Sequence, residues 1–222
     1  MKVIIWFSIL FVLLSLCASF ASYPSLPDKM ASHWDAQGNV NGYMGRFWGA
    51  YLMPLIQAAV VIILFVVPKI DPLKKNIDSF KKEYFLFILA ISSFLTLVHI
   101  QVLAINLGSE IDLGRNIPLM IGFLFILIGK VMQKIKRNFF IGIRTPWTIS
   151  SDIVWEKTHK IGSNLFILSG AVTLIASATG FYPFEILMIT IITTAIISIV
   201  YSFLEYRKLP KDEQDKLAPG ED

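Results

Sequence analysis

The chain has 222 residues, of which 55% are hydrophobic and 16% are charged, and it carries one cysteine. Soluble domains contain about 25% charged residues, so this chain is short of charge by about a third. That composition excludes a disordered chain and a disulfide-stabilised scaffold, and it argues against a soluble enzyme. It favours a protein that crosses a membrane several times.

Six almost uncharged stretches are long enough to cross about 30 Å of hydrocarbon as helices. They lack the alternation of barrel strands, and helices and closed barrels are the structures that satisfy the backbone in lipid. The predicted helices are residues 3–21, 48–68, 84–107, 117–133, 161–180 and 185–205. We therefore expect an all-α, polytopic membrane protein, a single six-helix domain over residues 1–222. Residues 206–222 are charged, contain two prolines and are expected to form a flexible cytoplasmic tail.

The lysines and arginines predict the orientation, because these residues accumulate in cytoplasmic loops. With both termini in the cytoplasm, 17 of the 20 basic residues lie on the inner side, and Lys29, Arg46 and Arg115 lie outside. The sequence thus predicts a multi-pass protein of the cell membrane with cytoplasmic N- and C-termini. The same distribution accounts for the net charge of +4, so no direct nucleic-acid partner is expected.

The first apolar segment allows two interpretations. Lys2, an apolar run and the small residues Ser19 and Ala21 also fit a signal peptide with a small-residue cleavage site. The run is long for a signal core and further spans follow it, which favours an uncleaved helix. Cys17 lies in this segment without a second cysteine to pair with, so we expect it to serve packing.

The predicted first outer loop contains a chemically mixed group, His33, Trp34 and Asp35, followed by turn-forming residues 36–42. A histidine and a carboxylate supply only two ligands, fewer than a metal site needs, so no metal is expected here. Trp34 can instead anchor an extracellular partner, which makes these residues a candidate peptide-recognition surface. The alternative is an interfacial loop whose aromatic residues lie at the level of the lipid headgroups.

The predicted fourth-to-fifth connection, Arg137–Lys160, is too apolar for a solvated loop, and we call it the inner segment. Pro146 forces Thr145 out of the helical region, and Ser150–Asp152 are good helix caps, so a helix is expected to start there and run into the fifth span. This predicts an amphipathic cytoplasmic segment before helix five. The alternative is an interfacial hairpin pinned by tryptophans and basic residues. The candidate functional residues are Gly142, Arg144, Thr145, Pro146, Trp147, Trp155 and His159.

Polar residues also lie within the predicted spans. His99 and Gln101 in the third helix allow a small transporter or permease as the alternative function, although interhelical hydrogen bonding is the simpler role. In the fifth helix, Ser169 and Thr173 with Gly170 form a close-packing face. No catalytic motif is present, and we expect no enzymatic activity and no cofactor.

Two stretches carry a resemblance to a known family. Leu26–Asp28, then His33–Trp34, a glycine-rich turn and Pro54 in the next helix are similar to the outer part of the SdpI-type membrane immunity proteins. Ile141–Thr148, followed by Trp155, resembles that family's most distinctive stretch. The six-helix layout also matches from end to end, so the resemblance covers nearly the whole chain.

A third stretch, Pro68–Pro72 with Asn76, is similar to a connection in family relatives of unassigned function. The resemblance implies protection of a bacterium against a secreted hydrophobic killing peptide, and signalling by sequestration of a winged-helix repressor at the membrane. The expected partners are therefore that toxin peptide, the cytoplasmic repressor and membrane lipids. If the family's roles apply to this chain, the loop at His33–Asp35 would contact the peptide. The stretch from Arg144 to Trp155 would either transmit the binding signal in the cytoplasm or serve as a structural element.

Overall fold

The computed structural model describes residues 2–211 and 214, and it contains six helices long and apolar enough to cross a membrane. These helices are α1 (Lys2–Ser22), α2 (Arg46–Ile70), α4 (Lys81–Asn106), α5 (Leu113–Met132), α7 (Asp152–Thr179) and α8 (Pro183–Arg207). The short elements are a 3-10 turn (Tyr23–Ser25), β1 (Lys29–Trp34), β2 (Val40–Gly45), α3 (Lys74–Ser79) and α6 (Pro146–Ser150). The chain is therefore an all-α, polytopic membrane protein with one small hairpin. Most of the predicted tail, 206–222, lies outside the described residues.

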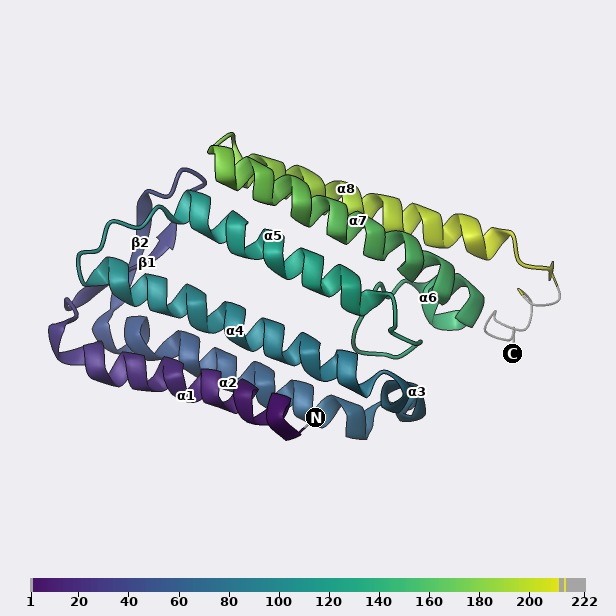
Figure 1. Cartoon of the computed structure of the whole chain (residues 1–222), viewed down its shortest axis with the longest axis horizontal. Coiled ribbons are helices and arrows are strands. Elements are labelled where there is room, and N and C mark those ends of the chain that lie inside the picture. Colours follow the sequence, from purple (N-terminus) through teal and green to yellow (C-terminus); the bar gives the residue numbers. More distant parts are fainter. Residues whose placement is uncertain (1, 212–213, 215–222) are drawn as a thin grey trace, which may run out of the picture.

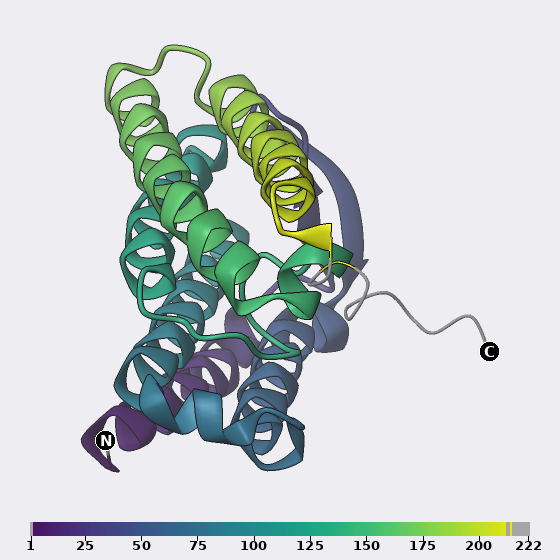
Figure 2. The same cartoon turned by 90° about the vertical axis from the view of Figure 1, so that its right-hand side faces the viewer.

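The six long helices form two layers (Figure 1). Helices α1, α2 and α4 pack together in one layer, α5, α7 and α8 pack together in the other, and α4 meets α5 between them. Figure 2 shows this arrangement from the end that carries α3 and α6, where α1 begins and α8 ends. We call this the inner end and the hairpin end the outer end, after the orientation that the sequence predicts.

Helices α5 and α7 approach each other closely because glycines face each other across their contact. A Cβ atom on Gly170 would lie 2.5 Å from the carbonyl oxygen of Gly122, and one on Gly129 would lie 2.7 Å from that of Ser163. In lipid, van der Waals contact between small residues drives helix association, since burial of apolar side chains adds little there. The predicted close-packing face around Gly170 is therefore the contact with α5, and Ser169 bonds to α8 through Thr194 at 2.8 Å.

The other layer is joined by buried hydrogen bonds between side chains. Gln57 of α2 donates to the Thr96 hydroxyl at 2.9 Å and accepts from the Ser15 hydroxyl at 2.7 Å. His99 lies 2.8 Å from the Ser19 hydroxyl, with none of its ring exposed. These bonds link α1, α2 and α4, and the bond of His99 to Ser19 supports the interhelical role for that histidine.

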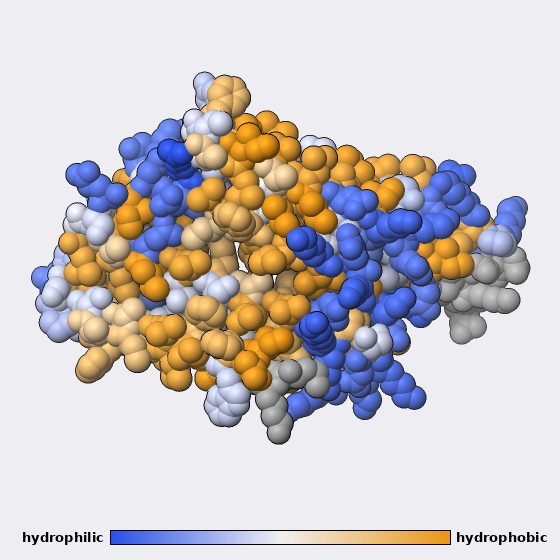
Figure 3. Space-filling model, viewed as in Figure 1, coloured by the Kyte–Doolittle hydropathy of each residue, from blue (hydrophilic) through white to orange (hydrophobic). Residues whose placement is uncertain are grey.

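Two helices begin earlier than their apolar runs suggest, because polar residues cap them. Asp112 accepts the amide of Arg115 and starts α5 at Leu113. Ser151 accepts the amide of Val154, so α7 begins nine residues before the predicted span and continues into it. The amphipathic segment before helix five is thus the first turns of α7. Figure 3 shows apolar side chains over the middle of the bundle and hydrophilic ones gathered toward its ends.

Candidate functional site

The inner segment is held in place by two side chains that are almost fully buried. Asn138 donates to the carbonyl oxygens of Lys136 and Ile141 at 2.9 and 3.0 Å and accepts the amides of Phe140 and Ile141. Asp71, at the end of α2, accepts the amide of Phe139 at 3.0 Å. Neither side chain is more than 2% exposed, and each satisfies backbone groups that would otherwise be buried without partners. The connection of α2 to α4 therefore supports the inner segment.

The centre of the inner segment is a stack of two rings beneath a glycine. The rings of Trp155 and His159 lie 4.0 Å apart at an angle of 17°, as their spacing on one helix face predicts. His159 Nδ1 donates to the Trp155 carbonyl at 2.9 Å, and Nε2 accepts the Ile143 amide at 3.0 Å. An acceptor at Nε2 requires the neutral ring. The histidine is thus a structural anchor for the turn at Ile143.

Gly142 lies directly against this stack. Its φ of 109° belongs to a region that side chains with a Cβ rarely adopt. A Cβ there would overlap His159 Nε2 and lie 3.2 Å from Trp155. The structure therefore brings together Gly142, Trp155 and His159, and close backbone approach explains why a glycine stands at this position.

Thr145 and Trp147 connect the inner segment to α8. Thr145 caps α6, with Pro146 in its first turn, and donates to the Ser202 hydroxyl at 3.0 Å. Trp147 packs on Phe203, with ring centroids 5.1 Å apart. Arg144 is exposed and donates to the Phe139 carbonyl at 2.6 Å, a contact that uses one of its five donors.

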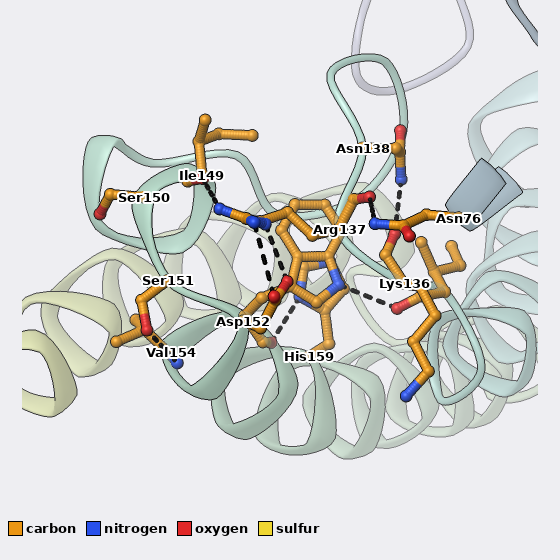
Figure 4. Close-up of polar contacts among 12 residues, drawn as sticks. Asn76, Lys136, Arg137, Asn138, Ile149, Ser150, Ser151, Asp152, Val154 and His159 are labelled. Atoms are coloured by element: carbon orange, nitrogen blue, oxygen red, sulfur yellow. Dashed lines mark hydrogen bonds and ion pairs between the residues drawn. The ribbon is translucent and has the colours of Figure 1, made fainter. Parts of the chain in front are cut away.

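A polar cavity of about 410 Å³ opens beside the stack, and we call it the inner cavity. Arg137 crosses its edge, 2.8 Å from the carboxylate of Asp152 and bonded to the Ile149 carbonyl (Figure 4). Asn76 bonds to the Arg137 carbonyl at 2.8 Å from the opposite side. The lining residues are Asn76, Ser79, Gln133, Lys134, Ile135, Lys136, Arg137, Asp152, Trp155, Glu156 and His159. Its mixed charges suit a polar partner.

At the outer end, the segment expected to be a loop forms a β-hairpin. The residue pattern indicated only its turn. Asp35 closes its turn by accepting the amides of Gln37 and Asn39, at 3.0 and 2.8 Å. The hydrogen bond from the Asn39 amide, then those from the Asn39 side chain and from the amides of Gln37 and Gly38, hold the pKa of Asp35 below its usual 3.8. His33 is exposed and bonds to Asn41. The polar atoms of His33 and Asp35 thus serve the hairpin itself, and Trp34 between them is half-buried.

Two contacts fix the hairpin on the bundle. Asn106 accepts the Ala31 amide at 2.7 Å and donates to the Ala31 carbonyl at 3.1 Å, so α4 clamps β1. At the tip, Gly38 lies against Gly114 at the start of α5. The hairpin therefore reaches from the first layer to the second. Asn106 lies near the outer end of α4, 75 positions after its partner in the chain.

A cavity of about 420 Å³, the outer cavity, lies between the hairpin tip and the turn from α7 to α8. Phe181 and Tyr182 in this turn are 64% and 62% exposed. Arg115 lies beneath them and donates to the carbonyls of Ser177 and Ala178, both at 2.6 Å. Within residues 2–211 and 214, no group of three metal-ligating side chains gathers here or elsewhere. The outer cavity offers exposed aromatic surface beside polar backbone.

Comparison with known proteins matches the two ends of the molecule to two different families. Residues 134–204 match the SdpI/YfhL protein family, and residues 10–58 match a domain of unknown function, DUF1648. The chain is also similar to the Immunity protein SdpI of Bacillus subtilis (strain 168), with 27% identity over 206 residues covering 91% of this chain and 95% of that protein. The resemblance to the SdpI-type immunity proteins is thereby confirmed. No solved structure matches the chain.

The SdpI-type match contains the whole inner segment, α7 and most of α8. The DUF1648 match contains most of α1, the hairpin and the first half of α2. Asp71 and Asn106, which support the two ends, lie outside both matched ranges. Helices α4 and α5, where the two layers meet, also lie outside them.

Proposed function

We propose that this chain is an integral membrane immunity protein that protects its cell against a secreted, hydrophobic killing peptide. The observation that carries the proposal is the similarity to an immunity protein over almost the full length of both chains. The protein acts by binding, without enzymatic chemistry. Both termini face the cytoplasm, an orientation supported by the distribution of basic residues.

The peptide is recognised at the outer end, by the hairpin and the outer cavity. Phe181 and Tyr182 are exposed aromatic side chains at a cavity mouth, the type of group that dominates binding energy at interfaces. Trp34 and His33 on β1 extend the same end of the molecule, and the clamp by Asn106 keeps the hairpin rigid. A rigid recognition surface loses less entropy when the peptide binds.

The inner segment is the part that signals, by holding a cytoplasmic winged-helix repressor when toxin is bound. The inner cavity and the exposed Arg144 supply charged groups for such a partner. Trp155, His159 and Gly142 keep this surface in one conformation. The partner would then be a protein, so the chain itself contacts no nucleic acid.

The test is expression in a toxin-sensitive host that is challenged with a panel of secreted membrane-active peptides. We expect survival with at least one peptide, and a clear loss of survival for Phe181→Ala or Trp34→Ala. Trp6→Ala is the matched control, since Trp6 is 69% exposed on α1, away from the outer cavity. Unchanged killing by every peptide, at normal membrane levels of the protein, would contradict the immunity function.

Two further measurements test the finer points. A fluorescent protein fused to the C-terminus should fluoresce, and an alkaline phosphatase fused there should be inactive, if that terminus is cytoplasmic. A winged-helix regulator encoded beside this chain should co-purify with it after exposure to the peptide, and less of it with Glu156→Lys, which alters the inner cavity. Equal recovery with and without the peptide would argue against signalling.

The alternative, a small transporter, has less support. His99 lines neither the inner nor the outer cavity, and Gln101 accepts the side-chain amide of Asn116 at 3.1 Å. We expect no pH-dependent uptake in liposomes and no effect of His99→Leu on flux. Uptake that the His99→Leu variant abolishes would restore the transporter hypothesis.

A further inference from the structure

A groove of about 480 Å³ runs between α4 and α5, where the two layers meet, and we call it the seam groove. Its walls are mostly aliphatic and aromatic, with Leu86 and Ala90 from α4 facing Leu127 and Ile128 from α5. The space-filling view shows the surface hollowed between the two layers. Neither family match reaches this groove, apart from Lys134 at its inner end.

The dimensions of the seam groove suit one lipid chain. On α4 the lining runs from Lys82 to Ser93, which at 1.5 Å per residue is about 16 Å. That length is about half of the 30 Å thickness of the hydrocarbon core, so the groove spans one leaflet. At its deep end, the Ser93 hydroxyl is bonded to the Ala90 carbonyl at 3.0 Å and leaves no strong polar group for a ligand. The deep part is therefore suited to an apolar tail.

The shallow end of the groove is basic. Lys82, Lys130 and Lys134 line it together with a single acid, Glu83, which pairs with Lys134 at 3.2 Å. Among residues 2–211 and 214, no acid pairs with Lys82 or Lys130, and both side chains lie on the surface. These lysines come from opposite sides of the seam, at the level where headgroups begin. Basic pockets between helices at this level attract anionic headgroups.

We propose that the seam groove binds an anionic phospholipid, with one acyl chain between α4 and α5 and its phosphate held by Lys82 and Lys130. The acyl chain fills the groove and adds to the contacts between the two layers, and the phosphate offsets the repulsion between the lysines. The lipid thus ties the two layers together. A neutral lipid fills the groove with the same kind of tail but leaves the lysines without a counter-charge.

Another apolar surface cavity, lined by Val3, Trp6 and Leu10 of α1, shows why the charge matters. It is similar in volume, at about 380 Å³, but its lining contains no basic residue. We expect this surface to accept neutral and anionic lipids alike. Selectivity for an anionic headgroup is therefore assigned to the seam groove.

The test uses the purified full chain in neutral detergent and measures the midpoint of thermal unfolding while phosphatidylglycerol or phosphatidylcholine is added. Phosphatidylglycerol should raise the midpoint at least tenfold more effectively, judged by the concentration needed for half of the effect. Lys82→Gln with Lys130→Gln should abolish this preference. Lys74→Gln with Lys75→Gln is the matched control on α3 at the same end, and it should retain the preference. Inorganic phosphate alone should have no effect, since it lacks the chain.

A second variant keeps the test valid if the double lysine variant does not fold. Ala90→Phe fills the groove while leaving both lysines, and in native mass spectrometry it should retain less phosphatidylglycerol than the unaltered chain. Equal stabilisation by the two lipids would overturn the proposal. So would full selectivity in the Lys82 and Lys130 variant, or an effect of inorganic phosphate that equals that of the lipid. These outcomes are independent of immunity, which is measured by survival.

Discussion

Substitution of Gly142 by alanine tests the arrangement at the centre of the inner segment. The new Cβ would overlap the ring nitrogen of His159, and the backbone would hold an alanine at a φ of 109°. A non-glycine residue in such a region costs about 1–3 kcal/mol. Displacement of His159 also leaves the Ile143 amide without its acceptor, which costs about 1–3 kcal/mol.

Together these effects predict a loss of about 4 kcal/mol for Gly142→Ala, the middle of the combined range. For a chain of this size, 1 kcal/mol lowers the unfolding midpoint by about 2–4 °C, so a fall of about 8–16 °C is expected. Tryptophan fluorescence during heating in detergent measures it. Trypsin should also cleave the inner segment faster, at Arg137 or Arg144.

Gly108→Ala is the matched control, because Gly108 has a φ of 95° but no atom within 4 Å of the added Cβ. It carries the backbone strain without the overlap, so its midpoint should fall less than that of Gly142→Ala. In combination with His159→Ala, the effect of Gly142→Ala should shrink by at least about 1 kcal/mol, since the overlap is then removed. Equal losses for the two glycines, or strictly additive effects with His159→Ala, would refute the reasoning.

Three further predictions concern single contacts. Asn106→Ala should weaken attachment of the hairpin by about 1–3 kcal/mol, because two buried backbone groups of Ala31 lose their partner. Hydrogen exchange at the Ala31 amide should therefore be faster, and unchanged exchange would contradict the clamp. Asn138→Asp keeps the shape but places an oxygen against two carbonyl oxygens, so it should lower the unfolding midpoint more than the exposed substitution Asn39→Asp; a smaller fall than that control would count against the buried role. The pKa of Asp35 is lowered in the folded chain, so its stabilisation of the turn is fully present above the usual value of 3.8 and is lost as the pH falls through the lowered pKa. The protection of the Asn39 amide from exchange, measured relative to its intrinsic rate at each pH, should therefore fall only below pH 3.8, and this fall should be absent in Asp35→Ala.

Some parts of the candidate site follow from local spacing. Trp155 and His159 are four residues apart, and helical geometry places them on one face, where they stack. Pro146 and the caps at Thr145 and Ser151 mark the start of α6 and α7 through rules that involve neighbouring residues. These features could be predicted because the interacting groups lie within a few residues of each other.

Other parts depend on residues that are distant in the chain. Asp71 bonds to an amide 68 positions later, and its role becomes visible only when α2 and the inner segment are placed together. The hairpin was missed because residues 36–42 indicated turns but the short flanking strands carry few β-branched residues. The partner of Gly142 is a histidine on another element, which a sequence pattern does not reveal.

The sequence by itself determined the six membrane spans, because hydrocarbon demands long apolar stretches and each helix satisfies its own backbone. The low content of charged residues, and their concentration in a few loops, predicted the number of spans and the side of the membrane that each loop faces. The tertiary structure alone decided how the helices divide into two layers and where the seam groove opens between α4 and α5. The physical reason is that helix packing in lipid depends on the shapes of surfaces that meet across the bundle, and hydropathy contains little information about these shapes.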